Sequence, residues 1–169
     1  MTVQLAHFSD CHSHFDGAPM RFSPDGESEW RTQCGGYGRI LTRLTALRQQ
    51  AEAAGQTCLL LHGGDTFQGS LYFNRFKGRA NADLLALLRP DAMVIGNHEF
   101  DDGPQELAKF IAAMKVPVIS GNTLAGLDSP VANKFKGYIV KEIGGQKVAV
   151  VSVLATDTDE TSSPGDSIL

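Results

Sequence analysis

Three short polar segments follow apolar runs, and they hold residue types from which a metal site can be built. They are Asp10 and His12 after the run 3–8, Asp65 after the run 58–62, and Asn97, His98 and Asp101 after the run 92–95. A buried strand that ends in such groups is poorly suited to simple packing, because each polar group needs a partner. Reactive groups of α/β sheets gather where strands end. The repetition at three predicted strand ends is the main functional signal.

The donors in these segments suit divalent metal ions. Asp10 and His12 are two residues apart, so in an extended segment their side chains point the same way. Asp65 follows Gly63-Gly64, which permits a tight turn, and its two oxygens could bridge two metals about 3.5 to 4 Å apart. Asn97 would add a neutral carbonyl oxygen. Mixed nitrogen and oxygen donors without a set of thiolates suit manganese, zinc or iron.

His98 and Asp101 form a candidate catalytic pair. Asp101 lies three residues after His98, within reach across one helical turn. A carboxylate that accepts from one ring nitrogen fixes the tautomer and favours the imidazolium. Such a histidine can stabilise a phosphoryl oxygen or protonate a leaving group.

Each segment taken alone also has a simpler explanation. Asp10 and His12 can occur together in a loop by chance, and Asp65 can cap a helix. Asp101 can belong to the acidic start of a helix at Pro104, where the helix dipole favours it. These explanations do not account for the coincidence of all three segments at strand ends. Further polar residues have structural interpretations: His7 and His62 as packed or supporting groups, His14 as a solvated side chain, and Glu99 as a satisfied surface acid.

The elements that must position these residues alternate along the first 120 residues. The predicted strands are 3–8, 57–61, 92–95 and 116–120, and the predicted helices are 40–54, 81–88 and one that starts at Pro104. Such alternation predicts an α/β fold with a mostly parallel sheet and helices outside it. Residues just after parallel strands share one sheet edge, so the polar segments should meet there.

Other parts of the chain show weaker patterns. Residues 138–143 and 147–153 predict a hairpin around Gly144-Gly145. Residues 13–34 lack periodicity and are interpreted as a long connection, either a rim over the site or a disordered insertion. Residues 67–76 predict a loop with a short helical turn, and residues 156–167 predict irregular polar chain.

Length and composition restrict the class of protein. The 169 residues suit one domain with 42% hydrophobic and 20% charged residues, and the net charge of −4 speaks against a polymeric nucleic acid partner. No apolar run is long enough to predict a membrane span. The first residues predict a strand and not a signal peptide, although a leader could have been removed. Three dispersed cysteines imply no disulfide framework, which on the sequence alone favours a cytoplasmic location.

The polar segments resemble the motifs of the calcineurin-like metallophosphoesterases, and specifically the 5'-nucleotidase and UDP-sugar hydrolase family. Asp10-Cys11-His12 is similar to its D-x-H motif, and Gly63-Gly64-Asp65 with Gln68-Gly69-Ser70 to its G-D segment. Gly96-Asn97-His98-Glu99-Phe100-Asp101 is similar to its G-N-H-E-F-D run, the most specific of the three. Gly35-Gly36-Tyr37-Gly38-Arg39 is similar to the family's entry to its first helix. The likeness extends from about Leu5 to about Val153.

The resemblance implies a phosphoester hydrolase with two divalent metal ions and a nucleotide or other small phosphoester as substrate. It assigns Asp10, His12 and Asp65 to one metal, Asp65 and Asn97 to the other, and His98 with Asp101 to catalysis. It implies a metal-bound hydroxide that attacks phosphorus. The alternatives are a 2',3'-cyclic phosphodiesterase, a sugar-nucleotide pyrophosphatase, a relative acting on sulfur esters, or a non-catalytic scaffold. Asp101 favours the nucleotidase, because the cyclic phosphodiesterases often carry Asn there.

One departure from the family pattern concerns the rest of its metal site. The family adds further histidines and a glutamine from the second half of its catalytic domain, and a substrate domain after that. This chain has no His after His98. We therefore expect residues 1–169 to be the N-terminal part of that domain, the first half of a two-sheet sandwich flanked by helices, without nucleotide-binding residues. By resemblance, a periplasmic or extracellular location is open if a leader was removed. The sequence does not assign an oligomeric state.

Overall fold

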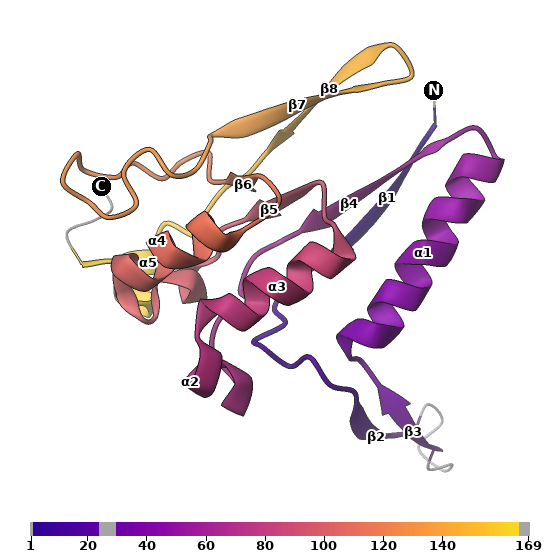
Figure 1. Cartoon of the computed structure of the whole chain (residues 1–169), viewed down its shortest axis with the longest axis horizontal. Helices are drawn as coiled ribbons and strands as arrows, with labels where there is room; N and C mark the ends of the chain where they lie inside the picture. Colours follow the sequence, from indigo (N-terminus) through magenta and orange to yellow (C-terminus); the bar gives the residue numbers. More distant parts are fainter. Residues whose placement is uncertain (1, 24–29, 166–169) are drawn as a thin grey trace.

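The computed structural model describes residues 2–23 and 30–165. Its centre is a sheet in which all neighbouring strands are parallel, in the order β1-β4-β5-β6 (Figure 1). The strands are β1 (Val3–Phe8), β4 (Thr57–His62), β5 (Ala92–Val94) and β6 (Val118–Ile119). The predicted α/β fold with a mostly parallel sheet is confirmed.

Helices cover one face of this sheet. They are α1 (Tyr37–Ala53), α3 (Gly78–Leu88) and α4 (Gly103–Ala113), with the shorter α2 (Leu71–Phe76) ahead of α3 (Figure 1). Leu60 of β4 and Met93 of β5 pack against Leu44 and Leu85 of the helical layer. The chain leaves α1 through Gly55, which has a φ of +63° and closes the helix.

The opposite face of the sheet is partly covered by the antiparallel hairpin of β7 (Tyr138–Ile143) and β8 (Gln146–Val151). Leu59 and Ala92 on this face pack with Val150 of β8. Since β4 is covered on both faces, its sequence is a continuous apolar run without alternation. The outer face of the hairpin leaves Tyr138 60% exposed and Val151 69% exposed.

The segment 13–34 contains structure that its sequence did not predict. Two antiparallel strands, β2 (Ala18–Phe22) and β3 (Trp30–Cys34), pair with each other, and residues 24–29 of the predicted connection lie outside the described residues. Ala18, Pro19 and Met20 are all exposed, and none of the other ribbon side chains whose burial is described is buried. Strands with exposed side chains leave no alternating apolar pattern to recognise.

The segment after residue 155 is more ordered than predicted. It contains the short helix α5 (Thr158–Thr161), and Thr158 is buried. Residues 166 and 167 of the predicted irregular chain lie outside the described residues. A helix of one turn is too short to impose a 3.6-residue pattern. Among the helices of the described residues, none has the length and hydropathy needed to cross a membrane.

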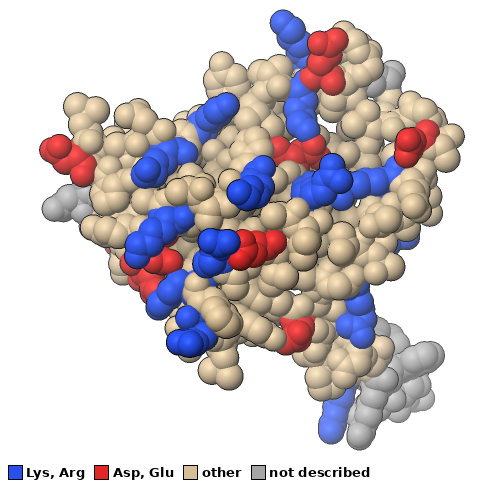
Figure 2. All heavy atoms as spheres, in the orientation of Figure 1, with Lys and Arg blue, Asp and Glu red and all other residues tan. Residues whose placement is uncertain are grey.

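The face of the molecule seen in Figure 1 carries positive and negative side chains side by side (Figure 2). Arg79 pairs with Asp83 at 2.8 Å within α3, and Lys77 pairs with Asp102 at 2.6 Å. Mixed charges of this kind are typical of a solvated helix face, and exposed pairs contribute little stability.

Candidate active site

The segments that follow β1, β4 and β5 are joined directly to one another. The N–H of Asp10 donates to the Gly64 carbonyl at 3.0 Å, and the N–H of His12 donates to the Asp65 carbonyl at 3.1 Å. The N–H of His98 donates to Asp65 Oδ1 at 3.1 Å. Because β1, β4 and β5 are neighbours in the sheet, their carboxyl ends bring the three polar segments to one edge. The predicted meeting of these segments is confirmed.

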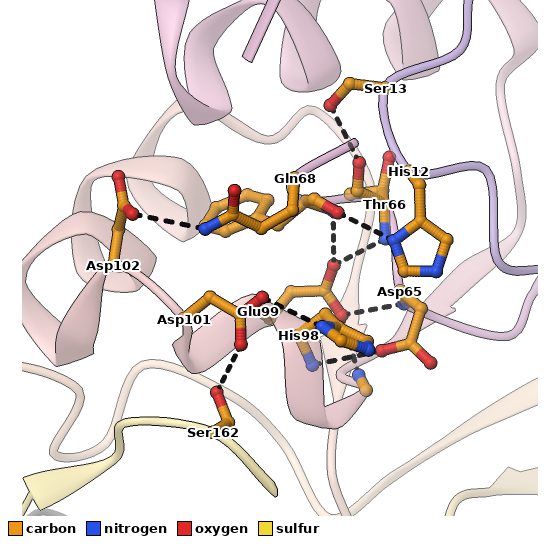
Figure 3. A network of polar contacts seen from close by, with 12 residues as sticks. His12, Ser13, Asp65, Thr66, Gln68, His98, Glu99, Asp101, Asp102 and Ser162 are labelled. Atoms are coloured by element: carbon orange, nitrogen blue, oxygen red, sulfur yellow. Dashed lines mark hydrogen bonds and ion pairs between the residues drawn. The ribbon is translucent and has the colours of Figure 1, made fainter. Parts of the chain in front are cut away.

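His12 and His98 face each other across this edge (Figure 3). Their rings meet edge to face, with the centroids 4.8 Å apart. His12 Nδ1 lies 3.0 Å from the Phe67 carbonyl oxygen. A carbonyl only accepts, so Nδ1 carries the proton and Nε2 of the neutral ring keeps a lone pair. This is the tautomer in which a histidine binds metal through Nε2.

His98 and Asp101 form the predicted pair. His98 Nδ1 lies 2.8 Å from Asp101 Oδ2, and since an ionised carboxylate only accepts, Nδ1 is the donor. The hydrogen bond with Asp101 raises the pKa of His98, while partial burial of the ring acts in the opposite direction. The pair therefore favours an imidazolium that can give a proton or stabilise negative charge.

The predicted ligands occupy unusual backbone conformations. Asp10, His12 and Asp65 have φ angles of +55°, +43° and +53°, in the left-handed region. Non-glycine residues there cost about 1–3 kcal/mol each and cluster at functional sites. Beside them, a Cβ at Gly96 would overlap Asp65 Oδ1. Glycine at this position therefore makes the room in which the Asp65 carboxylate lies.

Glu99 is fully buried, and its interpretation as a surface acid is wrong. Its Oε2 accepts the N–H groups of Asp65 at 2.9 Å and Gly96 at 2.7 Å, and its Oε1 accepts those of Thr66 at 2.7 Å and Phe67 at 3.3 Å. Burial raises the pKa of Glu99 to about 7, while these hydrogen bonds lower it. The side chain joins the loop after β4 to the loop after β5 (Figure 3). The sequence signal for one of these hydrogen bonds was that Glu99 lies three residues after Gly96, the spacing of a capping box.

A buried polar cluster ties the loop after β1 to the loop after β4. The Asn81 amide donates to the Thr66 carbonyl at 2.7 Å and to Ser13 Oγ at 3.0 Å, and Ser13 Oγ donates to the Thr66 carbonyl at 3.0 Å. These residues were missed from the sequence. Asn81 gave a signal, because it lies four and seven residues before Leu85 and Leu88 on the apolar face of its helix, where a polar group needs partners.

The metal-binding prediction can be compared with the donors at this edge. His12, Asp65 and Asn97 are half-buried, and Asp10 is exposed. Within residues 2–23 and 30–165, no three His, Cys, Asp or Glu side chains form a group that could hold a metal ion. The donor types and the tautomer of His12 fit a divalent ion. The described residues alone do not form a closed ligand set.

Comparison with known protein families shows which class this chain belongs to. The sequence model of the calcineurin-like phosphoesterases matches residues 3–162. The chain belongs to the calcineurin-like phosphoesterase family.

Several longer proteins are similar to this chain. A probable 5'-nucleotidase of Treponema pallidum is 34% identical over 98% of this chain and 27% of its own length. An apyrase of Tabanus yao is 33% identical over 96% of this chain and 28% of its own. The structure of NAD nucleotidase from Haemophilus influenzae matches with a TM-score of 0.89 at 31% identity, over 97% of this chain and 28% of that protein. The chain spans less than a third of the length of these relatives.

Proposed function

We propose that the complete protein is a two-metal phosphoester hydrolase of the 5'-nucleotidase kind. The observation that carries the proposal is the arrangement of Asp65 and the His98–Asp101 pair, held together where three parallel strands end. Family membership and the names of the relatives support it.

The proposed metal ligands lie at the same edge of the sheet. Asp10, His12 and Asp65 would hold one ion, and Asp65 and Asn97 the other, with further donors from outside residues 1–169. When bound, the two ions would neutralise phosphoryl oxygens and lower the pKa of a water nucleophile. Asp65 suits the shared position because a carboxylate offers two oxygens, and one of them already lies beside Gly96.

His98 would act on the substrate. Since Nδ1 is bonded to Asp101, Nε2 is the ring nitrogen that remains for a phosphoryl or leaving-group oxygen. The raised pKa of His98 keeps a proton available there. Proton transfer from a positioned acid contributes roughly 10²- to 10⁴-fold in rate.

Phosphate release from a nucleoside 5'-monophosphate tests the proposal. The complete gene product is assayed with manganese, after chelation, and after manganese is restored, while bound metal is measured by mass spectrometry. We expect activity to disappear and return with two metals per chain. His12→Asn should lower bound metal, whereas the exposed His14→Asn two residues away is the matched control. Metal-independent turnover would contradict the proposal.

A second candidate function is hydrolysis of larger nucleotide substrates. It is supported by the names apyrase and NAD nucleotidase among the similar proteins. The same assay on ADP, NAD, UDP-glucose and a 2',3'-cyclic nucleotide separates the two. Higher kcat/KM on one of these than on the 5'-monophosphate would replace the 5'-nucleotidase assignment.

A further inference from the structure

Asp101 has a second partner besides His98. Ser162 Oγ donates to Asp101 Oδ1 at 2.7 Å, while Oδ2 of the same carboxylate accepts from His98 (Figure 3). No sequence pattern indicated this contact, because Ser162 lies in a segment without a packing pattern. A serine, a carboxylate and an imidazole therefore form one line of hydrogen bonds that ends at the proposed reaction site.

The backbone holds Ser162 in place. Its N–H donates to the Thr158 carbonyl at 3.0 Å and closes α5. Thr158 is buried, and its hydroxyl donates to the Ala155 carbonyl at 2.6 Å. The preceding residue in the core, Leu154, exchanges two hydrogen bonds with the Asn122 side chain, at 2.7 and 2.9 Å. These hydrogen bonds hold the segment that places the Ser162 hydroxyl beside Asp101.

A second hydrogen bond to an aspartate restricts the rotation of its carboxylate. The χ2 torsion of Asp is broad and roughly two-fold, so a carboxylate held by one hydrogen bond can still rotate. A hydroxyl on the other oxygen restricts that rotation, and a hydrogen bond to an ionised group is about twice as strong as a neutral one. The backbone N–H of Asp101 also donates to the His98 carbonyl at 3.1 Å, which holds the backbone of Asp101 and leaves the rotation of its side chain to be restricted by side-chain contacts.

We propose that Ser162 is a positioning residue for catalysis, which fixes the Asp101 carboxylate and through it the direction of the His98 ring. The inference rests on the proposed hydrolase function. It predicts that Ser162 matters most when the leaving group needs a proton from His98. It also predicts no direct role in metal binding, because Ser162 contacts Asp101 and not a proposed ligand.

The test compares Ser162→Ala with the parent in the complete, manganese-loaded gene product. On a nucleoside 5'-monophosphate, which has a poor leaving group, kcat should fall on the order of 10-fold. On p-nitrophenyl phosphate, which has a good leaving group, kcat should change by less than about two-fold, because protonation is not needed there. KM and bound metal should stay the same. Ser162→Thr should restore kcat, and the exposed neighbour variant Ser163→Ala should match the parent.

A double variant and a spectroscopic signal complete the test. Ser162→Ala added to Asp101→Asn should cause no further loss, since both act through His98. In protein with ¹⁵N-labelled histidine, the His98 Nδ1–H resonance should weaken or shift in Ser162→Ala and recover in Ser162→Thr. If Ser162→Ala does not fold, the isosteric pair Ser162→Thr and Ser162→Val makes the same comparison.

The outcomes separate the two proposals. If the parent protein does not hydrolyse either ester, the proposed function fails, and the NMR signal alone decides the role of Ser162. If the parent is active, equal loss on both substrates, additive loss with Asp101→Asn, or an unchanged Nδ1–H resonance would each overturn the positioning role.

Discussion

Glu99 Oε2 accepts the backbone N–H of Asp65 at 2.9 Å, although 34 residues separate them in sequence. The carboxylate thereby joins the loop of the proposed bridging ligand to the loop that carries His98. Replacing it leaves backbone donors without an acceptor in a fully buried place.

Glu99→Gln should therefore destabilise the protein by about 2 kcal/mol or more, because an amide nitrogen cannot accept the N–H groups on one side. The free energy of unfolding, measured in urea at pH 8, checks this. Glu142→Gln, at an exposed position of β7, is the control and should change it little. Equal stability of the two variants would show that the Glu99 hydrogen bonds contribute nothing net.

A division of roles is expected between Asp65 and His98. In the complete protein, Asp65→Asn should lose both bound metal and turnover, because the proposed bridge loses its charge. His98→Asn should lose turnover on the order of 10²-fold or more while it keeps its metal. Asp101→Asn should be a milder form of His98→Asn, most visible with poor leaving groups. Metal content and kcat of the three variants decide this, and equal metal loss in Asp65→Asn and His98→Asn would refute it.

His62 should make stability depend on pH. The side chain is buried, and burial lowers its pKa to about 4, while Nδ1 accepts the Gly64 N–H at 3.0 Å. A depressed pKa means that the unfolded chain takes up the proton first, so the contribution is present above about pH 6.5 and is lost as pH falls towards 4. The loss attributable to His62 is about 3 kcal/mol.

The comparison variant for this prediction is His62→Asn, whose amide oxygen can still accept from Gly64 but which cannot be charged. Unfolding free energies at pH 7 and pH 4.5 are compared between the two proteins. The parent should lose more stability than the variant over this interval. Parallel curves would mean that His62 is not the group responsible.

Residues 1–169 prepared alone should be nearly inactive on nucleotides and hold at most one metal firmly. Asp65 and Asn97 are too few donors to offset dehydration of a second divalent cation. The exposed apolar groups Tyr138, Val140 and Val151 on the hairpin should also favour self-association. Analytical ultracentrifugation should show oligomers that Val140→Lys with Val151→Lys reduces. Brisk turnover with two metals per chain would contradict this view of the missing ligands.

The sequence was informative where burial and chemistry left regular patterns. The strands β1, β4 and β5 were visible as apolar runs, and the ends of those runs located the polar segments. The His98–Asp101 pair followed from a spacing of three residues. Contacts between distant segments left no such trace. None of the described side chains of the β2–β3 ribbon is buried. Glu99 looked like a surface acid because its spacing from Gly96 indicates only one of its four backbone donors.

The link from Ser162 back to Asp101 also has a consequence for biosynthesis. Glu99 can join the loops after β4 and β5 once residue 99 has left the ribosome, but the serine hydroxyl comes 61 residues after Asp101. At about 5–20 residues per second, a ribosome needs roughly 3 to 12 s to cover that distance. A nascent chain would pass through an interval in which the proposed ligand loops are joined while His98 and Asp101 still lack their outer anchor.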